Sequence, residues 1–224
     1  MKKILISFSM ILFALAGYSQ QAIKPVKLDS VVSVNLPVDF NKTDTLGQQT
    51  YSARGQYGYI IVSRVPNPPN KVLKKEKDLK NVFKEYIFKV QASLKEGNIT
   101  DNHDTIINKL EVRDFVLRTD TGSGVKLRKF RILYTQPVTY TFQYLYDEAR
   151  KDVASKEMDA FFKSIKSPPE LDGTDQYTTF GKWQGFSTTV IVLVAAGVAI
   201  IVFIVLMLRK KRRHDILLTD ITSK

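Results

Sequence analysis

The chain offers few side chains for catalysis or metal binding. Its only histidines are His103 and His214, and His103 lies close to Asp101 and Asp104. A metal or acid–base role for this short acidic run is one interpretation, and a solvated loop histidine is the other. We expect His214 in a cytoplasmic tail, so the two histidines cannot form a zinc-binding pair. The sequence therefore predicts no catalytic residue, no cofactor and no metal site.

Other patterns associated with catalysis lack their context. Gly122-Ser123-Gly124 has neither the strand-to-helix setting of a nucleophile elbow nor the length of a phosphate loop, so we predict a turn. The absence of cysteine excludes disulfides, thiolate metal sites and cysteine nucleophiles. Sequence alone cannot bring two carboxylates to the separation that a glycosidase needs. A hydrolase that uses carboxylates or His103 stays an alternative.

A series of lysines could instead bind an anionic surface. Lys74, Lys77, Lys80 and Lys84 recur at steps of three and four, as expected for one side of a helix. Such a face would meet lipid headgroups or an acidic polymer. The alternative is a solvated face with weak ion pairs, since Glu76 precedes Lys80 by four positions. The net charge of +12 favours anionic partners only weakly and does not imply nucleic acid.

These lysines belong to the longest helix that the sequence predicts, from Leu73 to Leu94. Asn70 is a suitable N-cap and Gly97 a suitable residue after the last turn. Apolar residues recur at steps of three and four and form one stripe: Leu79, Val82, Phe83, Tyr86, Ile87, Val90 and Leu94. We predict that Ser155 caps a second, shorter helix, whose inward face contains Met158, Phe161, Phe162 and Ile165.

Strand patterns occur on both sides of the long helix. We predict strands over residues 29–40, 49–53, 57–65, 106–117, 125–135 and 138–146. In the third of these, Tyr59, Ile61 and Val65 share one side while Ile60 and Val62 share the other. We therefore expect both faces of that strand to be covered.

An aromatic row stands on the last strand, where Tyr140, Phe142, Tyr144 and Tyr146 point to the same side. Aromatic rows can stack sugars or bases. Under a helix they are core, and we predict core.

The order of elements, with several short phrases, resembles the PsbP-like family. The phrases are Val32 to Pro37 with Phe40, the helix Leu73 to Leu94, the strands Lys126 to Tyr146, and Phe161 to Ile165. The resemblance covers Asp29 to Lys166. It implies an α+β fold, an antiparallel sheet packed with one long and one short helix, that relatives use mainly for binding and assembly. It implies no chemistry, because one fold serves many functions.

The chain also contains targeting and anchoring signals. Met1 to Ser19 has the basic start, apolar core and small residues of a signal peptide. Val190 to Leu208 is apolar throughout and long enough to span a bilayer of ~30 Å. Trp183 precedes this span, and five basic residues follow it: Arg209, Lys210, Lys211, Arg212 and Arg213. Basic residues mark the cytoplasmic flank, so we expect the preceding domain outside.

Together these signals predict a single-pass plasma-membrane protein. Its parts are a signal peptide (1–19), a linker (20–28), an exported α+β domain (29–167), a Pro/Gly stalk (168–186), a transmembrane helix (187–208) and a basic cytoplasmic tail (209–224). The main hypothesis is a non-enzymatic module that binds a partner protein or envelope component. The alternatives are the hydrolase and binding to anionic lipid through Lys74–Lys89.

Overall fold

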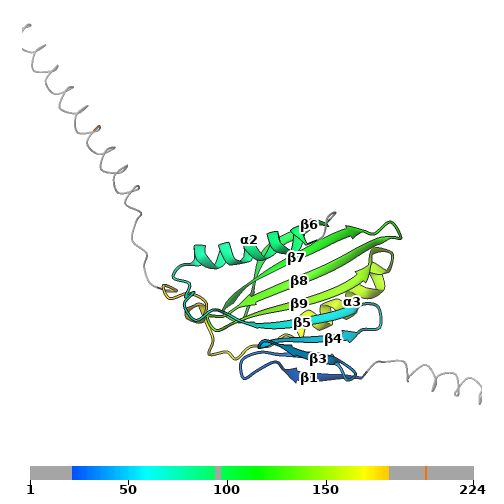
Figure 1. The fold of residues 1–224 in the computed structure, drawn as a ribbon, viewed down its shortest axis with the longest axis horizontal. Helices are drawn as coiled ribbons and strands as arrows, with labels where there is room; N and C mark the ends of the chain where they lie inside the picture. The colour runs from blue at the N-terminus through cyan, green and yellow to red at the C-terminus, as the bar shows by residue number, and fades with distance from the viewer. Residues whose placement is uncertain (1–21, 94–96, 182–199, 201–224) are drawn as a thin grey trace, which may run out of the picture. The chain divides into compact units, whose positions relative to one another are not determined.

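The computed structural model describes residues 22–93, 97–181 and 200 (Figure 1). The strands and helices within these residues are β1 (Ile23–Lys27), β2 (Ser33–Pro37), β3 (Asn41–Thr45), β4 (Gln48–Arg54), β5 (Tyr59–Pro66), α2 (Glu76–Ala92), β6 (Gly97–Ile107), β7 (Leu110–Asp120), β8 (Val125–Tyr134), β9 (Val138–Asp147), α3 (Lys151–Lys163), and the short 3-10 helices η2 (Glu148–Arg150) and η3 (Gly173–Asp175).

Strands β3 to β9 form one antiparallel sheet in the order β3-β4-β5-β9-β8-β7-β6. Strands β1 and β2 pair separately as an antiparallel hairpin. Helix α2 has 17 residues and α3 has 13. The predicted α+β class, an antiparallel sheet with one long and one short helix, is therefore confirmed.

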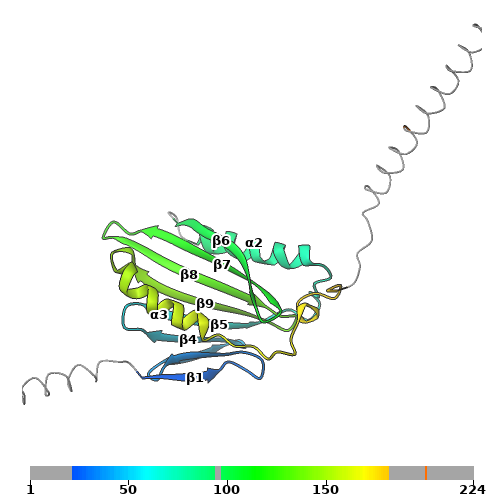
Figure 2. The same ribbon diagram turned by 180° about the vertical axis from the view of Figure 1, so that it is seen from behind.

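One face of the sheet, called the α3 face, is covered by α3 and the β1–β2 hairpin (Figure 2). The aromatic row of β9 is buried here, in a cluster with Phe161 of α3 and Leu36 of β2. The prediction that the row is core is confirmed. Its position follows from alternation, because every second side chain of β9 is large and apolar.

The opposite face, called the α2 face, is covered only in part. Leu79, Phe83 and Ile87 of α2 pack against the inward residues of β7 and β8: Phe115, Leu117, Phe130 and Ile132. On β5, Ile60 and Val62 are buried on the α3 face, whereas Tyr59 and Val65 are 41% and 36% exposed. The prediction that both faces of this strand are covered was wrong, because α2 does not extend over β4 and β5.

Helix α2 begins later than predicted. Its first turn is capped by Asp78, whose carboxylate accepts hydrogen bonds from the Lys74 and Lys75 backbone amides at 3.1 and 2.9 Å. Asn70 is therefore not the N-cap. A carboxylate inside the first turn accepts hydrogen bonds from free amides and also interacts favourably with the positive end of the helix dipole. Gly97 does not end the helix but begins β6.

The folded domain extends beyond the predicted boundaries at both ends. Strand β1 lies within the predicted linker and pairs with β2. In the predicted stalk, Gln176 and Tyr177 are buried. The Gln176 side chain forms hydrogen bonds with the backbone of Glu111 and Tyr134. This segment is therefore held by polar contacts, which an apolar pattern in the sequence does not reveal.

The predicted targeting and anchoring segments lie almost wholly outside the described residues. These are the signal peptide, the flanking residues Trp183 and Arg209 to Arg213, and the span apart from Ile200. In the part of the chain that the structure describes, no helix has the length and apolar content needed to cross a membrane.

Candidate functional site

The half of the α2 face that α2 leaves uncovered is formed by regular strands. On β9 the residues that alternate with the aromatic row are Thr139, Thr141, Gln143 and Leu145. Thr141 and Gln143 are buried, Thr141 beside Tyr86 of α2, and Leu145 is half-buried. The neighbouring strands β5 and β4 place Ser63 and Ser52 on this surface, also half-buried. A surface of mixed polarity is suited to reversible binding of a partner, because it is also stable in contact with water.

One cross-strand row links this open surface to the helix-covered part. Arg54 of β4 pairs with Tyr59 of β5, Tyr59 with Leu145 of β9, and Leu145 with Arg128 of β8. Arg128 in turn pairs with Leu117, which is buried under α2. Residues directly opposite in adjacent strands share a face and lie close together. The row therefore places Arg128 where the cover of α2 ends.

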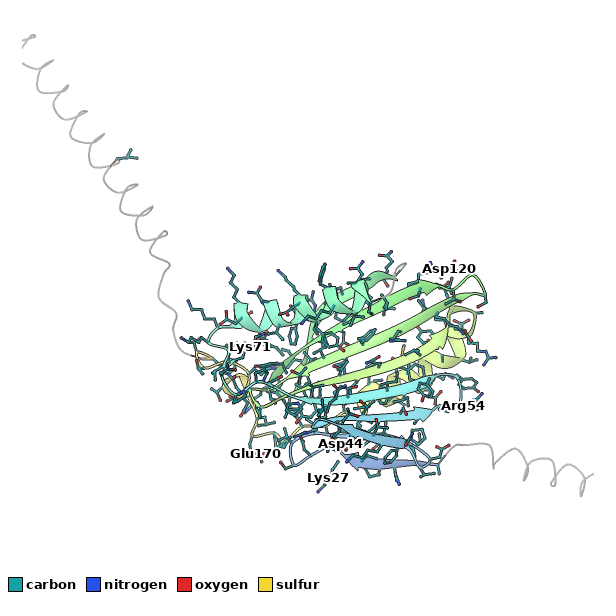
Figure 3. The ribbon with its side chains drawn as sticks, in the orientation of Figure 1. Lys27, Asp44, Arg54, Lys71, Asp120 and Glu170 are labelled. Carbon is teal, nitrogen blue, oxygen red and sulfur yellow. The ribbon has the colours of Figure 1, made fainter. Side chains whose placement is uncertain are left out.

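A hollow of about 430 Å³ lies at this end of the sheet. We call it the end hollow. It is lined by the β4–β5 turn, by the facing ends of β7, β8 and β9, and by Arg150. Figure 3 shows Arg54 and Asp120, which mark the β4–β5 and β7–β8 turns, at the same end of the sheet. Its volume lies in the range of sites for small ligands, ~300–1,000 Å³.

The β4–β5 wall of the end hollow is fixed by a carboxylate of α3. Glu157 accepts hydrogen bonds from the Gln56 and Tyr57 amides at 2.8 and 2.9 Å, and from the Tyr144 hydroxyl at 2.6 Å. Burial and the bond to Glu157 raise the pKa of Tyr144, so its hydroxyl stays a donor. A turn with this support keeps its shape when a ligand binds.

Gly58 in the same turn has a steric requirement. A Cβ at this position would lie 2.5 Å from the Leu145 carbonyl oxygen and from a Tyr144 ring carbon. Only glycine allows the turn to pack this closely against β9.

The end hollow is positively charged. Arg54, Lys126, Arg128 and Arg150 line it with a single carboxylate, that of Asp147. Lys126 forms a salt bridge with Asp147, and this hydrogen bond lowers the pKa of the Asp147 carboxyl. The acidic group therefore stays ionised and pairs with its neighbour Lys126, and the hollow keeps a net positive charge.

The predicted anionic-surface residues lie elsewhere, at the start and on the outer side of α2. Lys74, Lys77, Lys80 and Lys84 are all exposed. Lys80 pairs with Glu76, as the sequence spacing predicted. Lys74, Lys77 and Lys84 form no ion pair with any described residue. Phe88, one turn beyond Lys84, is 70% exposed.

His103 is not in the predicted loop but in the edge strand β6, next to a shift in register. Its Nδ1 lies 3.1 Å from an Asp101 carboxylate oxygen, and half of the imidazole is exposed. The Asp104 carboxylate forms a salt bridge with the Arg113 guanidinium at 2.6 Å. None of the residues that line the end hollow comes from β6. In the described ranges, no group of three or more His, Asp or Glu side chains is arranged to hold a metal ion.

The sequence did not reveal the end hollow, because its residues come from five strands in two separate parts of the chain, residues 54–59 and 119–150. The available signal was the polar half of the β8 pattern, where Lys126 and Arg128 alternate with Leu127. Basic residues on the outward side of a strand are usually solvated, so this pattern alone does not indicate a site.

The fold of the domain is PsbP-like. No protein-family model matches the sequence, and no curated protein matches it. The solution structure of cyanobacterial PsbP (CyanoP) from Synechocystis sp. PCC 6803 is similar with a TM-score of 0.50 and 15% identity, over 68% of this chain and 96% of that one.

Two further solved structures are similar to lesser degrees. A protein from Bacteroides thetaiotaomicron VPI-5482 matches with a TM-score of 0.43 and 14% identity, over 67% of this chain and half of that chain. LpqN, described as involved in cell envelope biogenesis of Mycobacterium tuberculosis, matches with a TM-score of 0.39 and 10% identity, over 66% of this chain and 91% of that one.

Proposed function

We propose that this protein is a non-enzymatic binding module of the cell envelope. In this proposal the signal peptide exports the domain, the span 187–208 tethers it to the plasma membrane, and residues 209–224 stay in the cytoplasm. The domain binds a partner protein or envelope component at the open half of the α2 face. The end hollow carries the proposal, because it combines a rigid wall, a concave shape and a net positive charge.

Site-specific photo-crosslinking tests this proposal. A photoreactive amino acid in place of Tyr59 would lie on the open surface beside the end hollow. The same amino acid in place of Lys163, which is exposed on α3, is the matched control. We expect a reproducible adduct in intact membranes from position 59 and none from position 163. The same adducts from both positions, or only abundant membrane proteins from position 59, would contradict the proposal.

A second candidate function, contact with anionic lipid, is favoured by the place where the chain leaves the domain. The backbone amides of Thr178 and Thr179 bond to the carbonyls of Leu73 and Lys74 at 3.1 and 3.0 Å. Five residues, 182–186, then separate Gly181 from the predicted span, and they reach at most ~18 Å. In this candidate function the predicted span is in the bilayer, and the basic start of α2 contacts the headgroups.

The outer side of α2 supports the same candidate. Lys77, Lys84 and Phe88 follow one another at spacings of seven and four, so they share one side of the helix. Lysines near an anionic membrane surface contribute ~1 kcal/mol each, and an exposed aromatic ring adds apolar contact.

A single-cysteine probe separates lipid contact from a solvated helix face. The chain has no cysteine, so Phe88→Cys and Val153→Cys can each be labelled with an environment-sensitive fluorophore. In the full chain, reconstituted with phosphatidylglycerol, we expect a blue shift at position 88 and none at position 153. The shift should disappear in 1 M salt, where the screening length is ~3 Å. A shift that does not depend on phosphatidylglycerol would exclude electrostatic docking.

A further inference from the structure

Arg128 is the least solvated cation of the end hollow. Its guanidinium lies over the Phe130 ring at 5.9 Å from the centroid, and the residue is half-buried. Burial lowers the pKa of Arg128, since a charge there has lost part of its water. A charge in this setting normally has a counter-ion.

Four other arginines in the strands each pair with a carboxylate. Arg64 meets Asp29 at 2.9 Å, Arg113 meets Asp104 at 2.6 Å, and Arg131 meets Asp114 at 2.6 Å. Even Arg118, which is well exposed, pairs with Glu148 at 3.2 Å. Arg128 forms no ion pair and no hydrogen bond through its side chain with any described residue. The fold therefore leaves its most desolvated hollow-lining guanidinium without an anion.

The rest of the end hollow determines what kind of anion fits. Arg54 and Arg150 add positive charge, and the one carboxylate, Asp147, is engaged by Lys126. Of the other ten lining residues, Gln56, Thr119 and Thr121 are polar, two are glycines, and five are aromatic or aliphatic: Tyr57, Tyr59, Leu127, Leu145 and Tyr146. A simple inorganic ion would leave these side chains without contact, and a neutral apolar molecule would leave Arg128 without a partner.

We propose that the end hollow binds an amphipathic acid, in which a carboxylate or phosphate group pairs with Arg128 and an apolar body contacts Tyr59 and Leu145. The planar guanidinium can donate two parallel hydrogen bonds to either oxyanion. Tyr59 and Leu145 are direct cross-strand neighbours, and Leu145 lies opposite Arg128, so one small ligand can reach all three. The inference rests on the proposed function, since it specifies the ligand of the same site.

Calorimetric titration of the detergent-solubilised full chain tests this inference with four probes. Phenyl phosphate and phenylacetate each combine an oxyanion with a ring, while inorganic phosphate and benzyl alcohol each supply one of the two parts. We expect both aromatic acids to bind more tightly than either partial probe. The better of the two acids shows whether the site prefers phosphate or carboxylate.

Substitutions assign the binding to Arg128. Loss of a charge-assisted hydrogen bond weakens binding by ~10-fold or more, so we expect that loss in Arg128→Gln. Arg118→Gln removes an equally cationic residue on the α3 face and should leave binding unchanged. Arg128→Lys keeps the charge without the planar fork and should bind at an intermediate level. The Arg128→Lys variant decides the question if Arg128→Gln fails to fold, as judged by circular dichroism.

Three results would overturn the inference. These are absence of binding by both aromatic acids, equal binding by inorganic phosphate, and unchanged binding in the folded Arg128 variants. Any of them, together with a specific adduct from position 59, would leave the binding module in place and remove only its acidic ligand. Binding of the aromatic acids without a specific adduct would instead support the ligand site and count against a macromolecular partner.

Discussion

The Tyr144 hydroxyl donates a hydrogen bond to the Glu157 carboxylate at 2.6 Å, and this bond joins the centre of the sheet to α3. The same carboxylate accepts the amides of Gln56 and Tyr57. One side chain thus connects β9, α3 and the β4–β5 turn. Because the turn also forms a wall of the end hollow, the stability of the core and the shape of the site depend on one residue.

Glu157→Gln should therefore destabilise the domain by about 1–3 kcal/mol, since an amide leaves at least one of three donors without an acceptor. Asp159→Asn, at an exposed position of the same helix, should change stability by less than about 0.5 kcal/mol. Urea denaturation of both variants measures the difference. Equal stability of the two variants would show that the three bonds contribute nothing net.

The Asp114–Arg131 pair should be far more important than the Arg118–Glu148 pair on the same face. The Asp114 side chain is 4% exposed and holds Arg131 through two bonds of 2.6 and 2.7 Å. Removing one partner of a buried pair costs about 3–5 kcal/mol, so Asp114→Asn should be strongly destabilising. Glu148→Gln breaks a pair that is 43% exposed on both sides and should cost less than about 1 kcal/mol. Thermal denaturation gives both values.

Asp29 should make stability fall in acid. Burial raises the pKa of Asp29, but bonds from Tyr140, Arg64 and two backbone amides outweigh it, so the pKa of the folded state is below the usual value. A carboxyl with a lowered pKa stabilises the fold fully above its unfolded pKa of about 3.9. This contribution is lost as the pH falls through the folded-state pKa.

The test is the unfolding free energy of the wild type and Asp29→Asn between pH 7 and strong acid. The two should differ most at neutral pH and converge below the unfolded pKa of about 3.9. A constant difference across this range would mean that the Asp29 charge has no part in folding.

Gly58→Ala should destabilise the β4–β5 turn, because its Cβ would meet backbone and ring atoms at 2.5 Å. Insertion of one methyl group into a packed site costs about 1–3 kcal/mol. Gly122→Asn is a suitable control, since nothing lies within 4 Å of a Cβ there and asparagine tolerates its φ of +73°. Urea midpoints compare the two variants. A large loss for Gly122→Asn alone would reverse this assignment.

The predictable part of the fold was the part with an apolar pattern. Strands β4, β5, β8 and β9 were predicted within a few residues, because burial on the α3 face imposes alternation. Strand β3 contains only Asn, Lys, Thr and Asp, and all five residues are exposed, so edge pairing alone defines it. Most of β6 was missed for the same reason, and His103 was therefore assigned to a loop.

The site was less predictable than the fold. Lys126 and Arg128 could be placed outside the core from their alternation with Leu127. Their neighbours Tyr59 and Leu145 depend on the strand order β5-β9-β8, which is not a local property of the sequence. Whether α2 covers Arg128 depends on the width of the helix relative to that of the sheet. No pattern of residues in the sequence predicts this coverage.

The burial of Gln176 has a mechanical consequence. Its amide group is held by Glu111 at 2.7 and 2.8 Å and by the Tyr134 carbonyl at 3.0 Å. A force that pulls on the chain beyond Gly181 would load these bonds, together with the contacts of Thr178 and Thr179 to the start of α2. The load would thus enter the sheet at β7 and β8, which lie inside the edge strand β6, and would not peel that edge strand away. This attachment would therefore resist unfolding of the domain when the chain is pulled from beyond Gly181.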